Sequence, residues 1–117
     1  MEQPTPAITR NDVERVIKRD FASNQFEEVL NILNRFDKPE NLHPRIQLDI
    51  LKLADKDISK LKVYLEQALR DYRDIITLAE YPEYGKQWRE ISSLSQDQID
   101  KIIASDWDQY NNWLSRK

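Results

Sequence analysis

His43 is the only side chain whose ordinary pKa suits proton transfer near neutral pH, and it stands directly before Pro44. A nucleophilic triad also needs a nucleophile and an orienting group, and metal sites need several His, Cys or carboxylate ligands. The chain has no second histidine and no cysteine to complete such a set around His43. We therefore expect His43 to be a residue at the start of a helix, and we expect no catalytic, cofactor-binding or metal-binding residue.

Carboxylates and cations alternate along residues 70–80. Paired carboxylates divide acid and base roles when their surroundings separate the two pKa values. Here Asp71, Asp74 and Glu80 share the segment with Arg70 and Arg73. This mixture is typical of a solvated helix surface with salt bridges. We expect no enzyme, although an enzyme that uses helix carboxylates stays open as an alternative.

A small basic cluster, Arg15, Lys18 and Arg19, lies near the N-terminus. Modules that stack nucleic-acid bases place exposed aromatic side chains among such cations. The nearest aromatic residue, Phe21, belongs to an apolar helix face instead. The cluster therefore predicts a solvated helix face and no nucleic-acid partner.

Aromatic residues concentrate in the second half of the chain, where Tyr and Trp predominate. The residues from Tyr72 onward are Tyr72, Tyr81, Tyr84, Trp88, Trp107, Tyr110 and Trp113. Tyr and Trp are the residues that most often anchor protein interfaces. Tyr81, Tyr84, Trp88 and Trp113 are therefore the candidate partner-binding residues, and packing of these side chains in the core is the alternative.

The elements that position these residues follow from apolar spacing and capping signals. The sequence predicts helices over residues 9–22, 24–36, 44–54, 58–80 and 95–114, a turn over 81–85 and a short helix within 86–94. The third helix should be the most buried and the fourth the longest. Residues 1–8 are expected to form a flexible leader, and residues 9–117 a single all-helical domain.

Composition excludes several classes of protein. The chain has no cysteine, so disulfides and thiolate metal sites are excluded, and its one glycine, Gly85, leaves no phosphate-binding glycine loop. Its 18 basic and 21 acidic residues argue against nucleic acid as a partner. No apolar run approaches the length of a membrane span, and the N-terminus does not resemble a secretory signal. We expect a cytoplasmic protein with no membrane partner.

The apolar pattern repeats after a shift of 32 residues. The shift aligns Phe21 with Leu53, Ala22 with Ala54, Phe26 with Ile58, Val29 with Leu61, and Leu33 with Leu65. In this spacing the chain resembles HEAT-like α-α hairpin repeat proteins and small bacterial helical proteins of that shape. The resemblance implies a binding scaffold in which the second helix of each pair lines one face, with residues 86–114 as a capping third unit.

The expected fold is all-α: a five-helix antiparallel bundle or a short HEAT-like α-α superhelix. The expected function is that of a non-catalytic protein–protein interaction module with a protein partner and no cofactor. An immunity- or antitoxin-type protein, whose acidic surface neutralises a basic toxin, is the alternative within the binding class.

Overall fold

Helices make up the regular structure of the described part of the chain. A computed structural model describes residues 8–36 and 43–116, and this part contains seven α-helices, two short 3₁₀ helices and no strand. In chain order they are α1 (Arg10–Asp20), η1 (Ser23–Gln25), α2 (Phe26–Leu33), α3 (His43–Ala54), α4 (Ile58–Arg70), α5 (Tyr72–Glu80), α6 (Pro82–Lys86), η2 (Trp88–Ser93) and α7 (Gln96–Leu114). The predicted all-helical class is confirmed, whereas five helices is too few.

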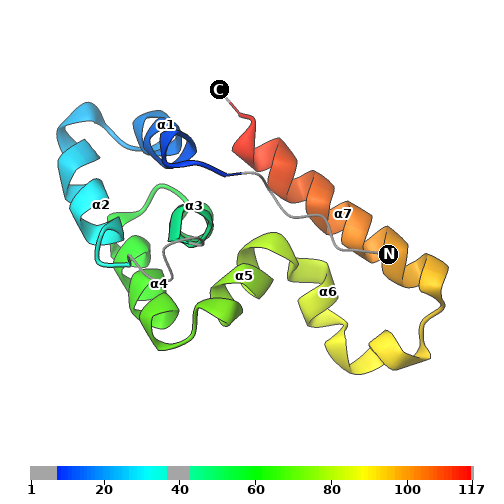
Figure 1. Ribbon diagram of the computed structural model, residues 1–117. Helices are drawn as coiled ribbons and strands as arrows, with labels where there is room; N and C mark the ends of the chain where they lie inside the picture. The colour runs from blue at the N-terminus through cyan, green and yellow to red at the C-terminus, as the bar shows by residue number, and fades with distance from the viewer. Residues whose placement is uncertain (1–7, 37–42, 117) are drawn as a thin grey trace.

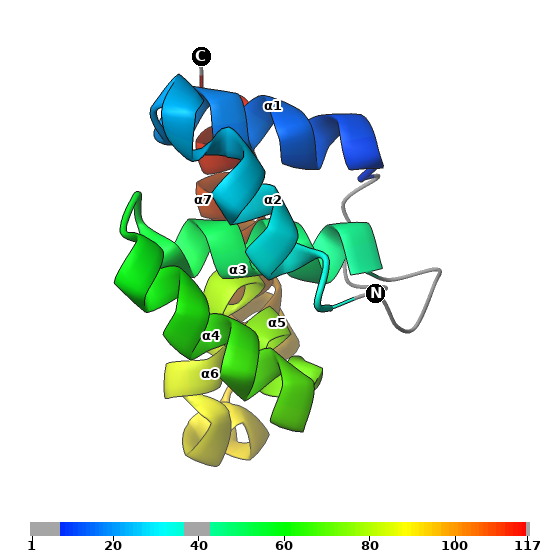
Figure 2. The same ribbon diagram turned by 90° about the vertical axis from the view of Figure 1, so that its left-hand side faces the viewer.

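The first four helices form two hairpins that lie one against the other. Helix α1 packs on α3, and α2 packs on α4 (Figure 2). Helices α1 and α4 begin at caps that the sequence predicts: Asp12 accepts a hydrogen bond from the backbone N–H of Thr9 (3.0 Å), and Asp57 accepts one from the backbone N–H of Ser59 (2.8 Å). The predicted loop near Pro39 and residues 1–7 of the predicted leader lie outside the described residues.

Helix α3 occupies the centre of the molecule and is the most buried element, as predicted. It contacts α1, α4 and α5, and every position from Ile46 to Leu51 is buried. The polar side chain of Gln47 can be buried at one of these positions because its amide nitrogen is hydrogen-bonded. It donates to the backbone oxygens of Leu33 (2.9 Å) and Phe36 (3.0 Å). A buried amide with satisfied donors holds the end of α2 against α3.

The prediction of one long helix over residues 58–80 is wrong, because the helix is interrupted at Asp71. This residue adopts an extended conformation (φ −157°, ψ 99°) and caps α5 by accepting a hydrogen bond from the backbone N–H of Arg73 (3.1 Å). The break separates α4 from α5 and changes which α5 residues face the core. Glu80, predicted to face solvent, is buried as a result.

The C-terminal part forms a second layer around the longest helix, α7. Residues 81–85, predicted as a turn, instead belong mostly to α6, with Pro82 at its first position, where the missing N–H costs no hydrogen bond. The predicted short helix within 86–94 is the 3₁₀ helix η2. Figure 1 shows α7 running from the neighbourhood of α1, past α6, to the chain that follows η2.

The basic cluster of α1 has a structural role at the end of α7. Arg15 donates to the backbone oxygen of Leu114 (2.9 Å), and Arg19 donates to that of Trp113 (2.8 Å). The last carbonyls of a helix have no partner within it, so cations here satisfy them and oppose the helix dipole.

In the described residues, no helix has the length and apolar character needed to cross a bilayer.

Candidate functional site

The four predicted partner-binding residues fall into two separate places. Tyr84 and Trp88 are neighbours on α6 and η2, with ring centroids 6.0 Å apart, and Trp88 is 65% exposed. Tyr81 is half-buried at the junction of α5 and α6. Trp113 is only 8% exposed and packs in the core beside Tyr110. Trp113 therefore does not belong to an exposed surface with the other three.

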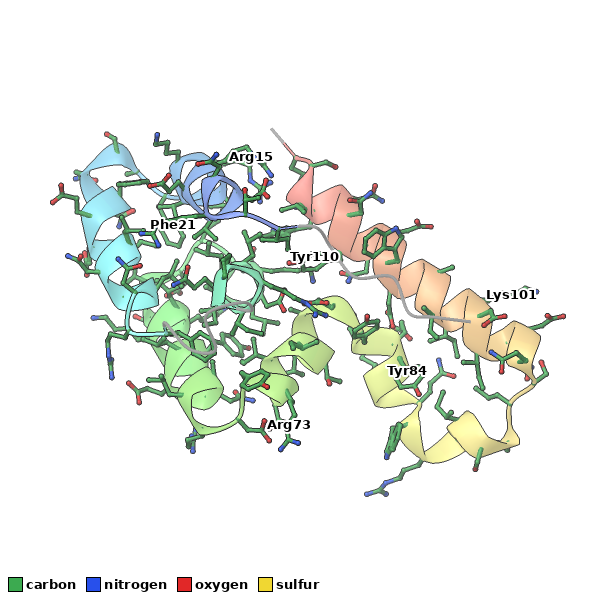
Figure 3. The ribbon with its side chains drawn as sticks, viewed as in Figure 1. Arg15, Phe21, Arg73, Tyr84, Lys101 and Tyr110 are labelled. Carbon is green, nitrogen blue, oxygen red and sulfur yellow. The ribbon has the colours of Figure 1, made fainter. Side chains whose placement is uncertain are left out.

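Tyr81, Tyr84 and Trp88 define what we call the aromatic surface. Beside it lies an open hollow of about 260 Å³. Its lining residues are Arg73, Ile76, Thr77, Tyr81 and Tyr84. Figure 3 shows Arg73 and Tyr84 on neighbouring elements, α5 and α6. The hollow offers apolar and aromatic walls with one cation at its edge.

Gly85 lets α6 approach α5 closely beneath the aromatic surface. A Cβ atom placed at this position would lie 2.7 Å from the Thr77 methyl carbon, Cγ2. A contact this short requires the Thr77 methyl or one of the two elements to move. The single glycine of the chain therefore permits the close approach of α6, which carries Tyr84, to α5.

A second group of polar residues is buried where α3, α5 and α7 meet, and we call it the ionic cluster. It consists of Arg45, Asp49, Glu80 and Tyr110. Arg45 forms a bidentate ion pair with Glu80, with Nε to Oε2 at 2.8 Å and Nη2 to Oε1 at 2.5 Å. Asp49 is fully buried one turn along α3 from Arg45. Tyr110, labelled on α7 in Figure 3, lies beside Asp49. Neither Asp49 oxygen nor the Tyr110 hydroxyl has a hydrogen-bond partner of regular geometry in the described residues.

Burial and crowding of carboxylates set the protonation of the ionic cluster. Burial, followed by the neighbouring Glu80 carboxylate, raises the pKa of Asp49 well above its usual range. Burial likewise raises the pKa of Tyr110, and Asp49 adds to this effect. The ion pair with Glu80 raises the pKa of Arg45. The cluster is therefore most stable with Asp49 and Tyr110 neutral and one ion pair between Arg45 and Glu80.

Two further polar residues of α7 attach it to α5 and α6. Asp106 is fully buried and accepts hydrogen bonds from the backbone N–H groups of Glu83 and Tyr84, both at 3.0 Å. These are orphan donors of the first turn of α6, so Asp106 serves as its cap from another helix. Gln109 donates to the backbone oxygen of Ala79 at 3.1 Å. The aromatic surface thus depends on α7 for its support.

The ionic cluster contains acid and base groups, but its two carboxylates and the Tyr110 hydroxyl are closed to solvent, and only Arg45 is partly exposed. Asp49 is 0%, Glu80 3% and Tyr110 1% exposed. A substrate must come within about 3 Å of a general acid or base to exchange a proton with it. The cluster therefore joins three helices in this conformation, and within the described residues no three His, Cys, Asp or Glu side chains form a set able to hold a metal ion.

Sequence reasoning did not find the ionic cluster, although one signal was present. Arg45, Asp49 and Lys52 stand at i, i+4 and i+7 and so share one face of α3. A row of charges on a helix whose other positions are apolar nearly all round implies charged partners inside the fold. The remaining candidates have structural places: Asp71 pairs with Arg73 and caps α5, and His43 begins α3.

Comparison with known proteins adds no relative to this description. No family model matches the chain, and neither the curated proteins nor the solved structures contain a significant match to it.

Proposed function

We propose that this chain is a non-catalytic protein–protein interaction module that binds its partner through the aromatic surface. The observation that carries the proposal is the exposure of Trp88. A large aromatic ring that is 65% exposed and stands against Tyr84 leaves apolar area in contact with water. Covering such area is the main driving force of protein association, and Trp and Tyr are its commonest anchors.

The layered hairpins support a scaffold role. Helix α1 packs on α3 and α2 on α4, which is how successive hairpins stack in a HEAT-like superhelix. In this proposal the two hairpins and the α5–α7 part form a short stack, and its last unit carries the binding surface. Rigid helices hold binding side chains more accurately than loops do.

The hollow beside the aromatic surface suggests how a partner is held. Ile76 and Tyr84 line its wall, and Arg73 lies at its edge with its side chain mostly exposed. An apolar side chain of the partner fits the hollow while Trp88 covers its flank. Such a contact places an aromatic anchor beside a small pocket, the arrangement found at binding hot spots.

A display selection followed by alanine substitution tests the proposal. Peptides or small domains are selected against the whole chain, and the binders are then titrated against the wild type, Trp88→Ala and Val63→Ala. Val63, on α4, is the matched control because it is 62% exposed but lies outside the aromatic surface. We expect Trp88→Ala to weaken binding by at least about thirtyfold, since hot-spot truncations cost about 2 kcal/mol or more.

The result that contradicts the proposal is a partner whose affinity is unchanged in Trp88→Ala. Loss of binding in Val63→Ala instead would move the interface to α4. Circular dichroism of both variants shows whether each keeps its helices. We expect no change in either, because both side chains are exposed.

A further inference from the structure

Asp49 places a second carboxylate in the ionic cluster, where the nearest cation is already engaged. Arg45 forms its bidentate ion pair with Glu80, through bonds of 2.8 and 2.5 Å. Asp49 is 0% exposed, and neither of its oxygens has a hydrogen bond of regular geometry within the described residues. A buried carboxylate charge without a partner is strongly disfavoured. Asp49 must therefore either keep its proton or reach water.

The titratable and charged groups around Asp49 do not supply a free cation. They are Arg45 and Lys52 of α3, Glu80 of α5, Tyr81 at the junction of α5 and α6, and Tyr110 of α7. Lys52 is half-buried and forms no ion pair with Asp49 in the described part of the chain. The Tyr110 hydroxyl can donate one hydrogen bond, whereas an ionised carboxylate accepts about four.

The other two helices that pack on α3 leave Asp49 among apolar residues. All residues of α1 and α4 that are at most 2% exposed are apolar. The largely buried ion pair of α1, between Arg19 and Asp20, lies at the end of α7 instead. Ionised Asp49 can thus be stabilised only by water, and one neighbouring element must move to admit it.

Helix α7 is the element that can move with the least loss of apolar packing. Its buried residues form one narrow seam along 19 residues: Ile103, Asp106, Tyr110 and Trp113. Helix α3, by contrast, is buried at every position from 46 to 51, and it packs against α1, α4 and α5. Residues 94 and 95, between η2 and α7, have extended backbone and can serve as the hinge.

Movement of α7 would also remove the support of the aromatic surface. Asp106 accepts hydrogen bonds from the backbone N–H groups of Glu83 and Tyr84, both at 3.0 Å. Gln109 donates to the backbone oxygen of Ala79 at 3.1 Å. When α7 departs, the first turn of α6 loses its cap and tends to fray. Tyr84 then stands on a less ordered helix.

We propose that Asp49 and Tyr110 form a proton-controlled latch between α3 and α7, which is closed while Asp49 is protonated and opens when Asp49 ionises. Opening admits water to Asp49 and removes the cap of α6, so the latch regulates the aromatic surface. This last step rests on the proposed function, whereas the opening itself does not.

The direction of the pH dependence follows from the proton that the closed latch holds. Burial raises the pKa of Asp49 in the closed state, whereas Asp49 in water loses its proton near pH 4. Between these two pKa values the open state binds fewer protons than the closed state. The equilibrium constant for opening therefore rises with pH, by up to about tenfold per unit.

Hydrogen exchange of the whole chain, followed by mass spectrometry from about pH 5 to pH 8, tests the latch. Rates are divided by those of unstructured amides at the same pH, which gives the opening constant of each segment. We expect the opening constant of residues 103–114 to rise with pH by up to about tenfold per unit. That of α4 should rise less, because α4 stays packed on α3 when the latch opens.

Asp49→Asn cannot ionise, so it should remove the pH dependence of α7. The matched control is Asp108→Asn, which removes an exposed carboxylate of the same helix and should behave as the wild type does. An equal pH dependence of α7 in Asp49→Asn and the wild type overturns the proposal. Equal opening of α4 and α7 in the wild type also overturns it, because the whole fold would then unfold together.

The exchange measurement involves no partner, so its outcome is separate from that of the proposed function. Trp88→Ala, the variant that tests the partner surface, should leave the exchange of α7 unchanged because Trp88 is exposed on η2. A change in α7 exchange caused by Trp88→Ala contradicts the assignment of the latch to Asp49 and Tyr110.

Discussion

Asp49→Asn separates the effect of a buried charge from that of a buried shape. Asparagine has nearly the same size as aspartate but cannot ionise, and its amide nitrogen is a donor. In the native protein, burial and the adjacent Glu80 raise the pKa of Asp49, so its neutral form is favoured. Wild-type Asp49 is neutral and able to donate to Glu80 only when it is protonated. An asparagine at this position is neutral and able to donate at every pH.

The size of the effect follows from proton linkage. An unfolded aspartate loses its proton near pH 4, whereas native Asp49 keeps its proton to a higher pH because its pKa is raised. Between these two pKa values the unfolded state binds fewer protons than the native state. The free energy of unfolding of the wild type therefore falls as pH rises, by about 1.4 kcal/mol per unit from this residue. From pH 4 to pH 7 the upper limit is about 4 kcal/mol.

Asp49→Asn lacks this cost, so the variant should become progressively more stable than the wild type as pH rises above about 4. Urea unfolding followed by circular dichroism, repeated from pH 4 to pH 8, measures the difference. Titrating groups distant from Asp49 cancel when variant and wild type are compared at one pH. Asp108→Asn, which removes an exposed α7 carboxylate, is the control and should show no such trend. A difference that stays constant or shrinks as pH rises refutes the reasoning.

The same urea titrations check three further predictions. Arg45→Met leaves Glu80 buried without its ion-pair partner, so it should destabilise the protein by about 3–5 kcal/mol; a loss below 1 kcal/mol contradicts this role. Lys56 has a positive φ of 68°, so Lys56→Gly should stabilise by about 1 kcal/mol, and a loss of stability contradicts the strain. Gly85→Ala should destabilise the protein by about 1 kcal/mol, because the added methyl meets the Thr77 methyl. Made in a Thr77→Ser protein, which lacks that methyl, Gly85→Ala should cost nothing. An equal cost in the wild-type and Thr77→Ser proteins contradicts the contact.

Much of the helical framework could be predicted because its signals are local. Asp57 and Ser95 cap α4 and α7 as their spacing predicts, since a cap involves only residues two or three positions away. The burial of α3 follows from apolar residues around most of its circumference. These features depend on neighbours in sequence, which the sequence itself displays.

The break at Asp71 could not be found from periodicity, because apolar residues continue on the same seven-residue spacing through it. Leu65, Tyr72 and Ala79 keep the pattern of one helix although they belong to two. Asp71 ends α4 by capping the next turn, and this choice depends on how α5 packs against α3. The buried position of Glu80 follows from the same break.

The candidate surface was predictable in part. Exposure of Trp88 agrees with its polar neighbours in the sequence, whereas Trp113 is buried although Asn111 and Asn112 precede it. The Arg19 guanidinium lies 5.2 Å from the Trp113 ring centre and covers it from another helix. The spacing of residues along the chain does not reveal such long-range partners, so the sequence could not show that Trp113 is a core residue and Trp88 a surface residue.

The contacts of Arg15 and Arg19 with the end of α7 also bear on the order of folding. These hydrogen bonds join residues 94 to 101 positions apart, nearly the whole length of the chain. Contacts so distant in sequence form late, because loop closure must precede them. Because α1 precedes α7 by most of this sequence, α1 is synthesised and can meet α3 before the end of α7 exists. Shortening α7 by its last turn would therefore leave the Arg15 and Arg19 donors without their carbonyl acceptors.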